Sequence, residues 1–412
     1  MTEREFAIEA VRILQQAGFR ALWAGGCVRD ELLGLHPHDY DVATDARPEQ
    51  VMKLFRRCLA VGAAFGVIEV IGPRGPHRKH LTVEVATFRS DGAYTDGRHP
   101  DSVTFSSAEQ DAQRRDFTIN GLFFDPIAED VFDYVGGRAD LAAGVLRAIG
   151  DPVARFTEDK LRVLRAVRIA ARFDLDIDAA TLAAARDIAP QIAVVSAERI
   201  AEELRKLLAH PNRARGVKLL REFDLIAPVL PELESANWDD VVRVEELLEG
   251  EVSFELAFAA MLHRLVPSQV ERVADRLKLS RAESVRLAWL VQMHESLLES
   301  PTMRLSRLKP ILIHPGIGEL LALHRAIARA GGRSVEHVAF CEAMLRETPP
   351  EELNPPPLVT GEDLIALGLK PGPEFKRLLD AVRERQLENR LRSKDAGLQL
   401  VRELQAAPGP RS

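Results

Sequence analysis

Residues 25–44 read Gly-Gly-Cys-Val-Arg-Asp-Glu-Leu-Leu-Gly-Leu-His-Pro-His-Asp-Tyr-Asp-Val-Ala-Thr and follow the apolar run of residues 21–24. Gly25 and Gly26 therefore stand at an expected strand-to-helix turn, where backbone N–H groups and the helix dipole favour an anion. Arg29 would add a fixed positive charge for phosphate. Taken alone, a glycine pair is more often a plain tight turn.

Two aspartates in the same stretch strengthen this interpretation. In an extended strand, residues i and i+2 point to the same face, so Asp39 and Asp41 should project together while Tyr40 faces away. Two such charges repel each other unless a cation lies between them. Carboxylate oxygens on a rigid strand suit Mg²⁺, which also binds substrate phosphates. The alternative is a solvated turn with two capping aspartates.

A third carboxylate, Glu84, lies in the strand-like run of residues 81–86. Val83 and Val85 should face a core, and Glu84 should face the opposite side. With Asp39 and Asp41 it would form a cluster able to hold two metal ions about 3.5–4 Å apart. Such ions activate an attacking hydroxyl and neutralise a triphosphate. A lone acid in a strand is otherwise part of an exposed face.

Composition limits the class of protein. The 412 residues suggest about two to four domains, with the hydrophobic (46%) and charged (28%) content of a soluble globular protein. Residues 1–20 predict an amphipathic helix and not a signal peptide, and no run approaches the roughly 18 apolar residues that span a membrane. The three cysteines show no paired spacing. We therefore expect a cytoplasmic protein, with no membrane association and no protein partner indicated.

The net charge of −7 means that a nucleic-acid substrate would require locally concentrated positive charge. Residues 155–172 provide it, with six basic residues against two acids. Asp159 and Arg162 are three apart, so in a helix they would be neighbours, with Glu158 holding the guanidinium. An Asp acceptor beside an Arg donor complements the Watson–Crick edge of C and A and opposes that of U and G. The alternative is an ordinary salt-bridged helix.

The pattern of predicted secondary structure changes near residue 140. Before it, short β-rich runs alternate with helical stretches, which predicts an α+β fold with a mixed sheet and flanking helices. After it, helical patterns follow one another and predict an all-α remainder. Five prolines in residues 349–357 should not continue a helix and predict a stiff spacer. Beyond the spacer, residues 358–412 hold two helical patterns.

Residues 25–30 with Asp39 and Asp41 resemble the first motif of class II tRNA nucleotidyltransferases and bacterial poly(A) polymerases. Four more stretches resemble the family's motifs in order, namely residues 114–122, 133–141, 158–168 and 198–208. The resemblance covers about half the chain strongly, and the tail more loosely. It implies a nucleotidyltransferase head (1–140), a helical neck that recognises the nucleotide base (141–210), an RNA-binding helical body (211–348) and a Pro-rich linker with a helical tail (349–412).

The resemblance also implies an activity, namely Mg²⁺-dependent transfer of CMP and AMP from CTP and ATP to the 3′ end of tRNA. It implies Arg115 and Asp116 near the ribose and phosphates, and Arg165 and Arg168 near the triphosphate. Gly26 and Arg29 belong to the same nucleotide site. Asn120 is expected to be structural. Asp96 and Arg98 lie in a glycine-rich stretch that resembles the flexible loop accompanying the switch from C to A addition.

Three alternatives remain open from the sequence. A poly(A) polymerase would use the same chemistry on a different acceptor, and a tRNA nucleotidyltransferase that adds only A would work beside a CC-adding partner. The third alternative, an RNA-binding protein on an inactive transferase fold, is disfavoured because every expected carboxylate is present.

Overall fold

A mixed seven-stranded sheet forms the centre of the first of two units in the computed structural model, which describes residues 1–75, 79–92 and 102–406. The strand order is β3-β4-β5-β2-β1-β8-β9. Strands β2 and β5 pair in parallel, and every other neighbouring pair is antiparallel. The strands are β1 (Ala21–Ala24), β2 (Asp41–Thr44), β3 (Cys58–Gly62), β4 (Val67–Arg74), β5 (His80–Thr87), β8 (Leu122–Asp125) and β9 (Asp130–Asp133).

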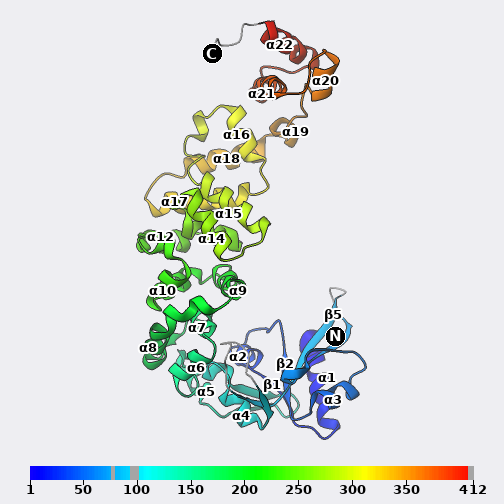
Figure 1. Ribbon diagram of the computed structural model, residues 1–412, viewed down its shortest axis with the longest axis vertical. Coiled ribbons are helices and arrows are strands. Elements are labelled where there is room, and N and C mark those ends of the chain that lie inside the picture. Colours follow the sequence, from blue (N-terminus) through cyan, green and yellow to red (C-terminus); the bar gives the residue numbers. More distant parts are fainter. Residues whose placement is uncertain (76–78, 93–101, 407–412) are drawn as a thin grey trace. The chain divides into compact units, whose positions relative to one another are not determined.

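Helices α1 (Glu3–Gln16) and α3 (Pro48–Leu54) lie on the β4–β5 side of this unit (Figure 1). The N-terminus of α1 is closed by a capping box between Thr2 and Glu5, and its buried face begins at Phe6. This face packs in one core with residues of β2, β4 and β5. The amphipathic helix predicted at the N-terminus is therefore confirmed, and one face of the sheet is covered.

Strand β5 shows the predicted alternation. Val83 and Val85 are buried in the core beneath α1, whereas Thr82 and Glu84 are exposed on the opposite face. A short helix, α4 (Ala108–Gln113), contributes Ala108 and Ala112 to a second, smaller core with residues of β1 and β8. The face of the sheet that carries Glu84 is therefore covered near β1 and β8 and stays open farther out.

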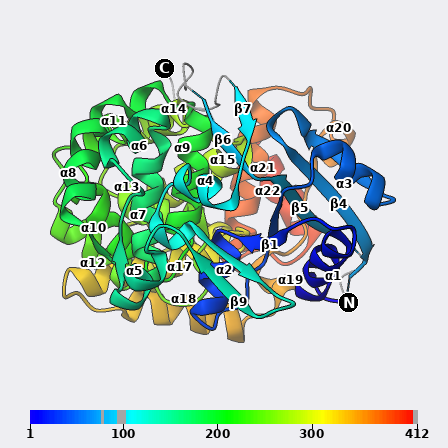
Figure 2. The same cartoon turned by 90° about the horizontal axis from the view of Figure 1, so that it is seen from below.

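Helices follow the sheet in the remainder of the first unit, residues 1–234. Figure 2 shows them on the side away from α1 and α3. They are α5 (Gly137–Ala143), α6 (Pro152–Glu158), α7 (Leu161–Phe173), α8 (Ala179–Ile188), α9 (Ala197–Leu208), α10 (Arg213–Glu222) and α11 (Ile226–Val229). Helix α2 (Gly26–Leu32) instead connects β1 to β2. The short strands are β6 (Arg89–Asp91), β7 (Val103–Phe105), β10 (Val145–Leu146) and β11 (Asp176–Ile177).

The second unit, residues 235–412, is helical throughout its described part. The expected α+β head followed by an all-α remainder is thus confirmed. Its helices are α12 (Trp238–Glu246), α13 (Phe254–Leu262), α14 (Pro267–Arg276), α15 (Arg281–Met293), α16 (Leu305–Leu312), α17 (Ile317–Ala330), α18 (Glu336–Glu347), α19 (Pro350–Leu353), α20 (Gly361–Ala366), α21 (Pro373–Leu387) and α22 (Lys394–Ala406).

The C-terminal part differs from expectation in two details. The prolines of residues 349–357 do not continue α18, as expected, but Pro350 begins a helical turn at residues 350–353, because its missing N–H costs nothing at the first helical position. The tail holds three helices and not two, packed around a small core that includes Leu364, Leu378 and Leu400. The boundary between the units at residue 234 falls inside the predicted body, and the finer division of the chain stays a prediction.

No single helix in the described part of the chain has both the length and the apolar character needed to span a membrane. Helices α16 and α17 together have the necessary length and composition, but they are bent by 106° at the break between them.

Gly137, the first residue of α5, provides a test of the packing in the first unit. A Cβ atom there would lie 2.1 Å from the carbonyl oxygen of Thr118, and that backbone cannot move aside. We expect Gly137→Ala to lower the free energy of unfolding by about 1–3 kcal/mol. Scanning calorimetry should show a lower melting temperature for the first unit.

Gly318→Ala in α17 is the control, because a Cβ atom at Gly318 meets nothing within 4 Å. Alanine should be neutral or slightly stabilising in that helix. Equal melting behaviour of the two variants would contradict the close approach of α5 to Thr118.

Candidate active site

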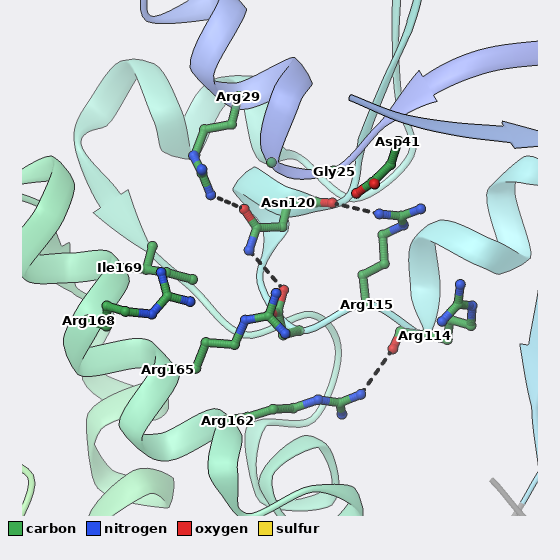
Figure 3. A pocket seen from close by; sticks show the side chains of 12 residues that line it. Gly25, Arg29, Asp41, Arg114, Arg115, Asn120, Arg162, Arg165, Arg168 and Ile169 are labelled. Carbon is green, nitrogen blue, oxygen red and sulfur yellow. Dashed lines mark hydrogen bonds and ion pairs between the residues drawn. The ribbon is translucent and has the colours of Figure 1, made fainter. Parts of the chain in front are cut away.

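A pocket of about 360 Å³ opens between the sheet and helix α7 (Figure 3). Six arginines line it against two carboxylates, so its net charge is strongly positive and suits a polyphosphate. The lining residues are Gly25, Gly26, Arg29, Asp41, Arg114, Arg115, Asp116, Asn120, Arg162, Arg165, Arg168 and Ile169.

The predicted glycine turn forms one wall of the pocket. Gly25 has a φ of +79°, which L-residues rarely adopt, and Gly26 begins α2. A Cβ atom on Gly25 would lie only 2.7 Å from an Nη1 atom of Arg115. Glycine is therefore required here for both the backbone conformation and the approach of the guanidinium.

Strand register brings the carboxylates into a row. Asp41 on β2 lies directly beside Glu84 on β5, and Glu84 lies beside Glu69 on β4. Tyr40 points to the other side, as predicted, where its ring packs 4.7 Å from that of Trp23 and its hydroxyl donates to Glu31. Asp39 is exposed immediately before β2. Asp41 and Glu84 therefore share one face of the sheet, and Asp41 marks the edge of the pocket.

The pKa of Asp41 is raised to about 6. The largest cause is loss of hydration inside the pocket, although the residue as a whole is exposed at the pocket edge. The negative charges of Glu84 and Asp39 raise the pKa further. A divalent cation would relieve this repulsion, so these oxygen donors fit one. Among the residues that the structure describes, no group of three metal-ligating side chains converges on one point. An ion held here would need water or phosphate oxygens as well, which is how Mg²⁺ is usually bound.

Asp116 lies buried in the floor of the pocket. Its carboxylate accepts hydrogen bonds from the backbone N–H of Phe117 (2.8 Å) and the amide of Asn120 (3.0 Å), and it pairs with Arg165 at 3.1 Å. Burial alone would raise the pKa of Asp116, but Arg165 and the Asn120 bond outweigh it and hold the pKa below its usual range. Asp116 is therefore a fixed anion beneath a cation that remains half exposed.

Arg115 is held by Asp111, whose carboxylate lies 3.0 Å from an Nη atom of Arg115. Asp111 also pairs with Arg114, and both ion pairs keep the pKa of the buried Asp111 low although burial opposes them. Asp111 supports two arginines of the pocket and was missed in the sequence, where no spacing distinguishes it from other helical acids.

Arg29 is buried, and its guanidinium is fully engaged by protein groups. It pairs with Asp30, donates to the side-chain oxygen of Asn120 at 2.5 Å and stacks 4.1 Å from the centre of the Phe173 ring. Burial lowers the pKa of Arg29, while Asp30 opposes that effect. Arg29 lines the pocket as a fixed charge whose position is set by Asp30, Asn120 and Phe173.

Asn120 was expected to be structural, and the structure places it in the pocket wall as well. Its side chain bridges Arg29 and Asp116, accepting from one and donating to the other. Arg114 and Ile169 also line the pocket without having been singled out from the sequence, and Arg114 is adjacent to the predicted Arg115. In the sequence, Arg114 and Asn120 could have been predicted as pocket residues only from their place in the charged motif of residues 114–120.

Helix α7 presents Arg162, Arg165 and Arg168 to the pocket because a spacing of three keeps them on one side of the helix. Arg162 pairs with Glu158, as predicted, and Arg168 pairs with Glu203 of α9. Figure 3 shows the three side chains reaching into the pocket from one helix.

The expectation that Asp159 and Arg162 share a helix is wrong. Helix α6 ends at Glu158 and α7 begins at Leu161, which leaves Asp159 extended between them. Its carboxylate accepts from Arg199 of α9 at 2.7 Å and from the N–H of Leu161 at 3.1 Å. Within the described chain, Asp159 does not line the pocket, whereas Arg162 does. Asp96 and Arg98 lie outside the described residues.

Comparison with known proteins agrees with this geometry. A family model described as "Poly A polymerase head domain" matches residues 21–147, and one described as "Probable RNA and SrmB- binding site of polymerase A" matches residues 174–237. A CCA-adding enzyme of Lactococcus lactis is 32% identical over 394 residues, 93% of this chain and 92% of that protein. Poly(A) polymerase I of Haemophilus influenzae is 36% identical over 67% of this chain, which spans only 59% of that longer relative.

Among solved structures, the CCA-adding enzyme of Bacillus stearothermophilus in complex with CTP superposes with a TM-score of 0.80 and 27% identity, covering 98% of both chains. Enzymes of this family transfer nucleotides with the help of divalent metal ions. Given the arginine pocket, the adjacent carboxylates and these relatives, the chain belongs to the nucleotidyltransferase family of CCA-adding enzymes and bacterial poly(A) polymerases.

Proposed function

We propose that this nucleotidyltransferase adds CMP and AMP from CTP and ATP to the 3′ end of tRNA, and so builds or repairs the CCA terminus. The observation that carries the proposal is the six-arginine pocket ending at Asp41, with Glu84 beside it. CCA-adding relatives that match the chain over nearly its whole length support it.

The chemistry is one in-line displacement. The 3′-hydroxyl oxygen of the RNA forms a bond to the α-phosphorus of the nucleotide, the bond from that phosphorus to the bridging oxygen breaks, and pyrophosphate leaves. Asp39 and Asp41, supported by Glu84, would hold Mg²⁺. The bound ion would lower the pKa of the attacking hydroxyl and would offset the negative charge of the leaving pyrophosphate. Arg115, Arg165 and Arg168 are proposed to bind the phosphates and sugar beside Asp116. Gly26 and Arg29 complete that wall.

Base choice is assigned to Asp159 and Arg162. Arg162 is oriented by Glu158 and Asp159 by Arg199, so each side chain has a fixed direction before a nucleotide binds. An acceptor from Asp159 and a donor from Arg162 match cytosine and adenine without any template. Because the two residues are separated by a break between helices, their relative position depends on α9 as well as on α7.

Extension of tRNA transcripts ending before CCA, after C and after CC tests the proposal. The wild-type protein with Mg²⁺ should add C, C and A and then stop. Asp41→Asn should slow extension by roughly 10³-fold, because the Mg²⁺ that stabilises the transition state would lose a carboxylate ligand. CTP should still bind the arginines. Asp130→Asn, exposed on β9 of the same sheet, is the control.

The other outcomes identify the alternatives. An unlimited A tail on unrelated RNA would mean a poly(A) polymerase, a possibility raised by the Haemophilus relative. Addition of A to the CC-ended transcript alone would mean an A-adding enzyme. No incorporation, with RNA binding unchanged in Asp41→Asn, would mean an RNA-binding protein.

The raised pKa of Asp41 predicts the pH dependence of metal binding. The carboxyl is protonated below about pH 6 and ionised above it, so affinity for Mn²⁺, used as a probe, should rise as pH increases through about 6. Glu84→Gln removes a negative neighbour and should shift this midpoint to lower pH. Glu69→Gln is the control, because Glu69 lies one strand farther from Asp41 than Glu84 does and should have a weaker effect on its pKa. An equal shift in both variants would contradict the pairing of Asp41 with Glu84.

Asp159→Asn tests base choice. An amide offers a donor as well as an acceptor, so it should tolerate the carbonyl of UTP or GTP and reduce discrimination against them by ~10-fold or more. Incorporation of each nucleotide onto the C-ended transcript measures this. Asp176→Asn, at an exposed ion pair with Arg215, should change nothing. Unchanged selectivity in Asp159→Asn would remove this residue from base recognition.

A further inference from the structure

Among the described residues, the sheet face that carries Asp41 and Glu84 stays exposed at Glu84 and at Leu59 of the edge strand β3. Register places Leu59 of β3 beside Glu69, which lies beside Glu84. Helices α1 and α3 pack on the opposite face, where Ile68, Val70 and Val83 are buried. On the open face Glu84 is exposed and Leu59 is 49% exposed. We call this surface of β5, β4 and β3 the open face.

Positive charge lies at the far end of the open face. The backbone oxygen of Arg57 accepts from the N–H of Ile71, so Arg57 lies at the sheet edge, two residues before Leu59 and at the start of β3. There it also lines a hollow with Phe55 and Ile71. Arg74 at the end of β4 lies beside His80, which is four residues before Glu84 and shares its face. At ~3.3 Å per residue, His80 lies about 13 Å from Glu84 along β5.

Both arginines are available to a ligand. Arg57 and Arg74 are exposed, and within the described part of the chain neither makes an ion pair. This contrasts with the pocket, where Arg29, Arg115 and Arg168 are each held by a carboxylate. In a chain of net charge −7, two guanidinium groups that form no ion pair with any described residue and lie at the far end of these strands favour an anionic partner.

The reaction geometry indicates which anion. In-line displacement requires the attacking hydroxyl to approach from the side opposite the leaving pyrophosphate. The arginine pocket occupies the β1–β8 side of Asp41, because its lining includes Gly25 after β1 and Asn120 before β8. Glu84 and the open face lie on the other side of Asp41 in the strand order. With the triphosphate in the arginine pocket, as proposed, an acceptor approaching from the opposite side would pass Glu84 and lie over the open face.

We propose that the last nucleotides of the acceptor RNA lie across the open face, with backbone phosphates bound by Arg57 and Arg74. The inference rests on the proposed function and extends it to the path of the acceptor strand. Thr82 and Ile71 lie on that path between the carboxylates and the arginines, and Leu59 provides an apolar surface for sugars and bases beside it. Binding along this path should not depend on the base sequence of the RNA, because contacts to phosphates position a strand without recognising its bases.

The test compares the full chain with Arg57→Ala/Arg74→Ala. Fluorescence anisotropy with a labelled RNA hairpin bearing a single-stranded 3′ end gives Kd across a series of KCl concentrations. We expect binding on the order of 10-fold weaker and a salt slope reduced by about 2, one for each phosphate contact. The KM for CTP should stay unchanged. Arg57→Lys/Arg74→Lys should retain most of the affinity, because lysine still binds phosphate as a point charge.

The matched control is Arg12→Ala/Arg138→Ala, which removes the same charge at exposed positions on α1 and α5. It should leave both Kd and salt slope near wild type. A blunt-ended hairpin should not distinguish wild type from Arg57→Ala/Arg74→Ala, since it lacks the single strand.

Three results would overturn the inference. Unchanged Kd and slope in Arg57→Ala/Arg74→Ala, in a protein whose wild type extends RNA, would place the acceptor elsewhere and leave the proposed function intact. An equal loss with the blunt hairpin would mean general attraction and not a strand path. Failure of the wild type to bind or extend any RNA would reject the proposed function itself.

Discussion

The amide of Asn120 is the interaction on which the rest of the site depends. It accepts from Arg29 and donates to Asp116, so it joins two buried charges of opposite sign. Burying either charge alone would cost several kcal/mol, but hydrogen bonds to partners of matched polarity offset that cost. Asp30 continues the network at one end and Arg165 at the other. Helix α2, the Asn120 segment and helix α7 are thereby fixed together, and the arginine pocket lies between them.

The neighbouring carboxylates show the opposite electrostatic situation. Asp41 and Glu84 are adjacent in register and carry like charges, and the pKa of Asp41 is correspondingly raised to about 6. Pocket arginines such as Arg115 and Arg168 form ion pairs with carboxylates, whereas Asp41 and Glu84 have no such partner among the described residues. Residual attraction for a cation therefore concentrates at the pocket edge, beside the proposed position of the triphosphate. The two halves of the site therefore differ in charge balance, as expected if the arginines bind the triphosphate and the carboxylates a metal ion.

The sequence predicted the features that depend on near neighbours along the chain. The glycine turn, the inward Tyr40, the alternation around Glu84 and the Glu158–Arg162 pair follow from local geometry. It failed where tertiary contact decides. The helix breaks at Asp159, whose partner Arg199 lies 40 residues away, and Asp111 and Asn120 acquire their roles only through folding. The structure gives the positions of the described site residues, and the catalytic, metal-binding and nucleotide-binding roles of all the predicted site residues stay predictions.

Helix α7 is fastened to the sheet side at two places on one face, through Arg165 to Asp116 and through Arg172 to Asp30. These anchors are seven residues apart, about 10 Å along the axis at 1.5 Å per residue. Because the two ion pairs are separated along α7, they restrict both its rotation about its axis and its tilting as long as both remain formed. If the protein adds both C and A as proposed, the adjustment between the two bases would come from side-chain rotations or from the break at Asp159, while α7 keeps its position.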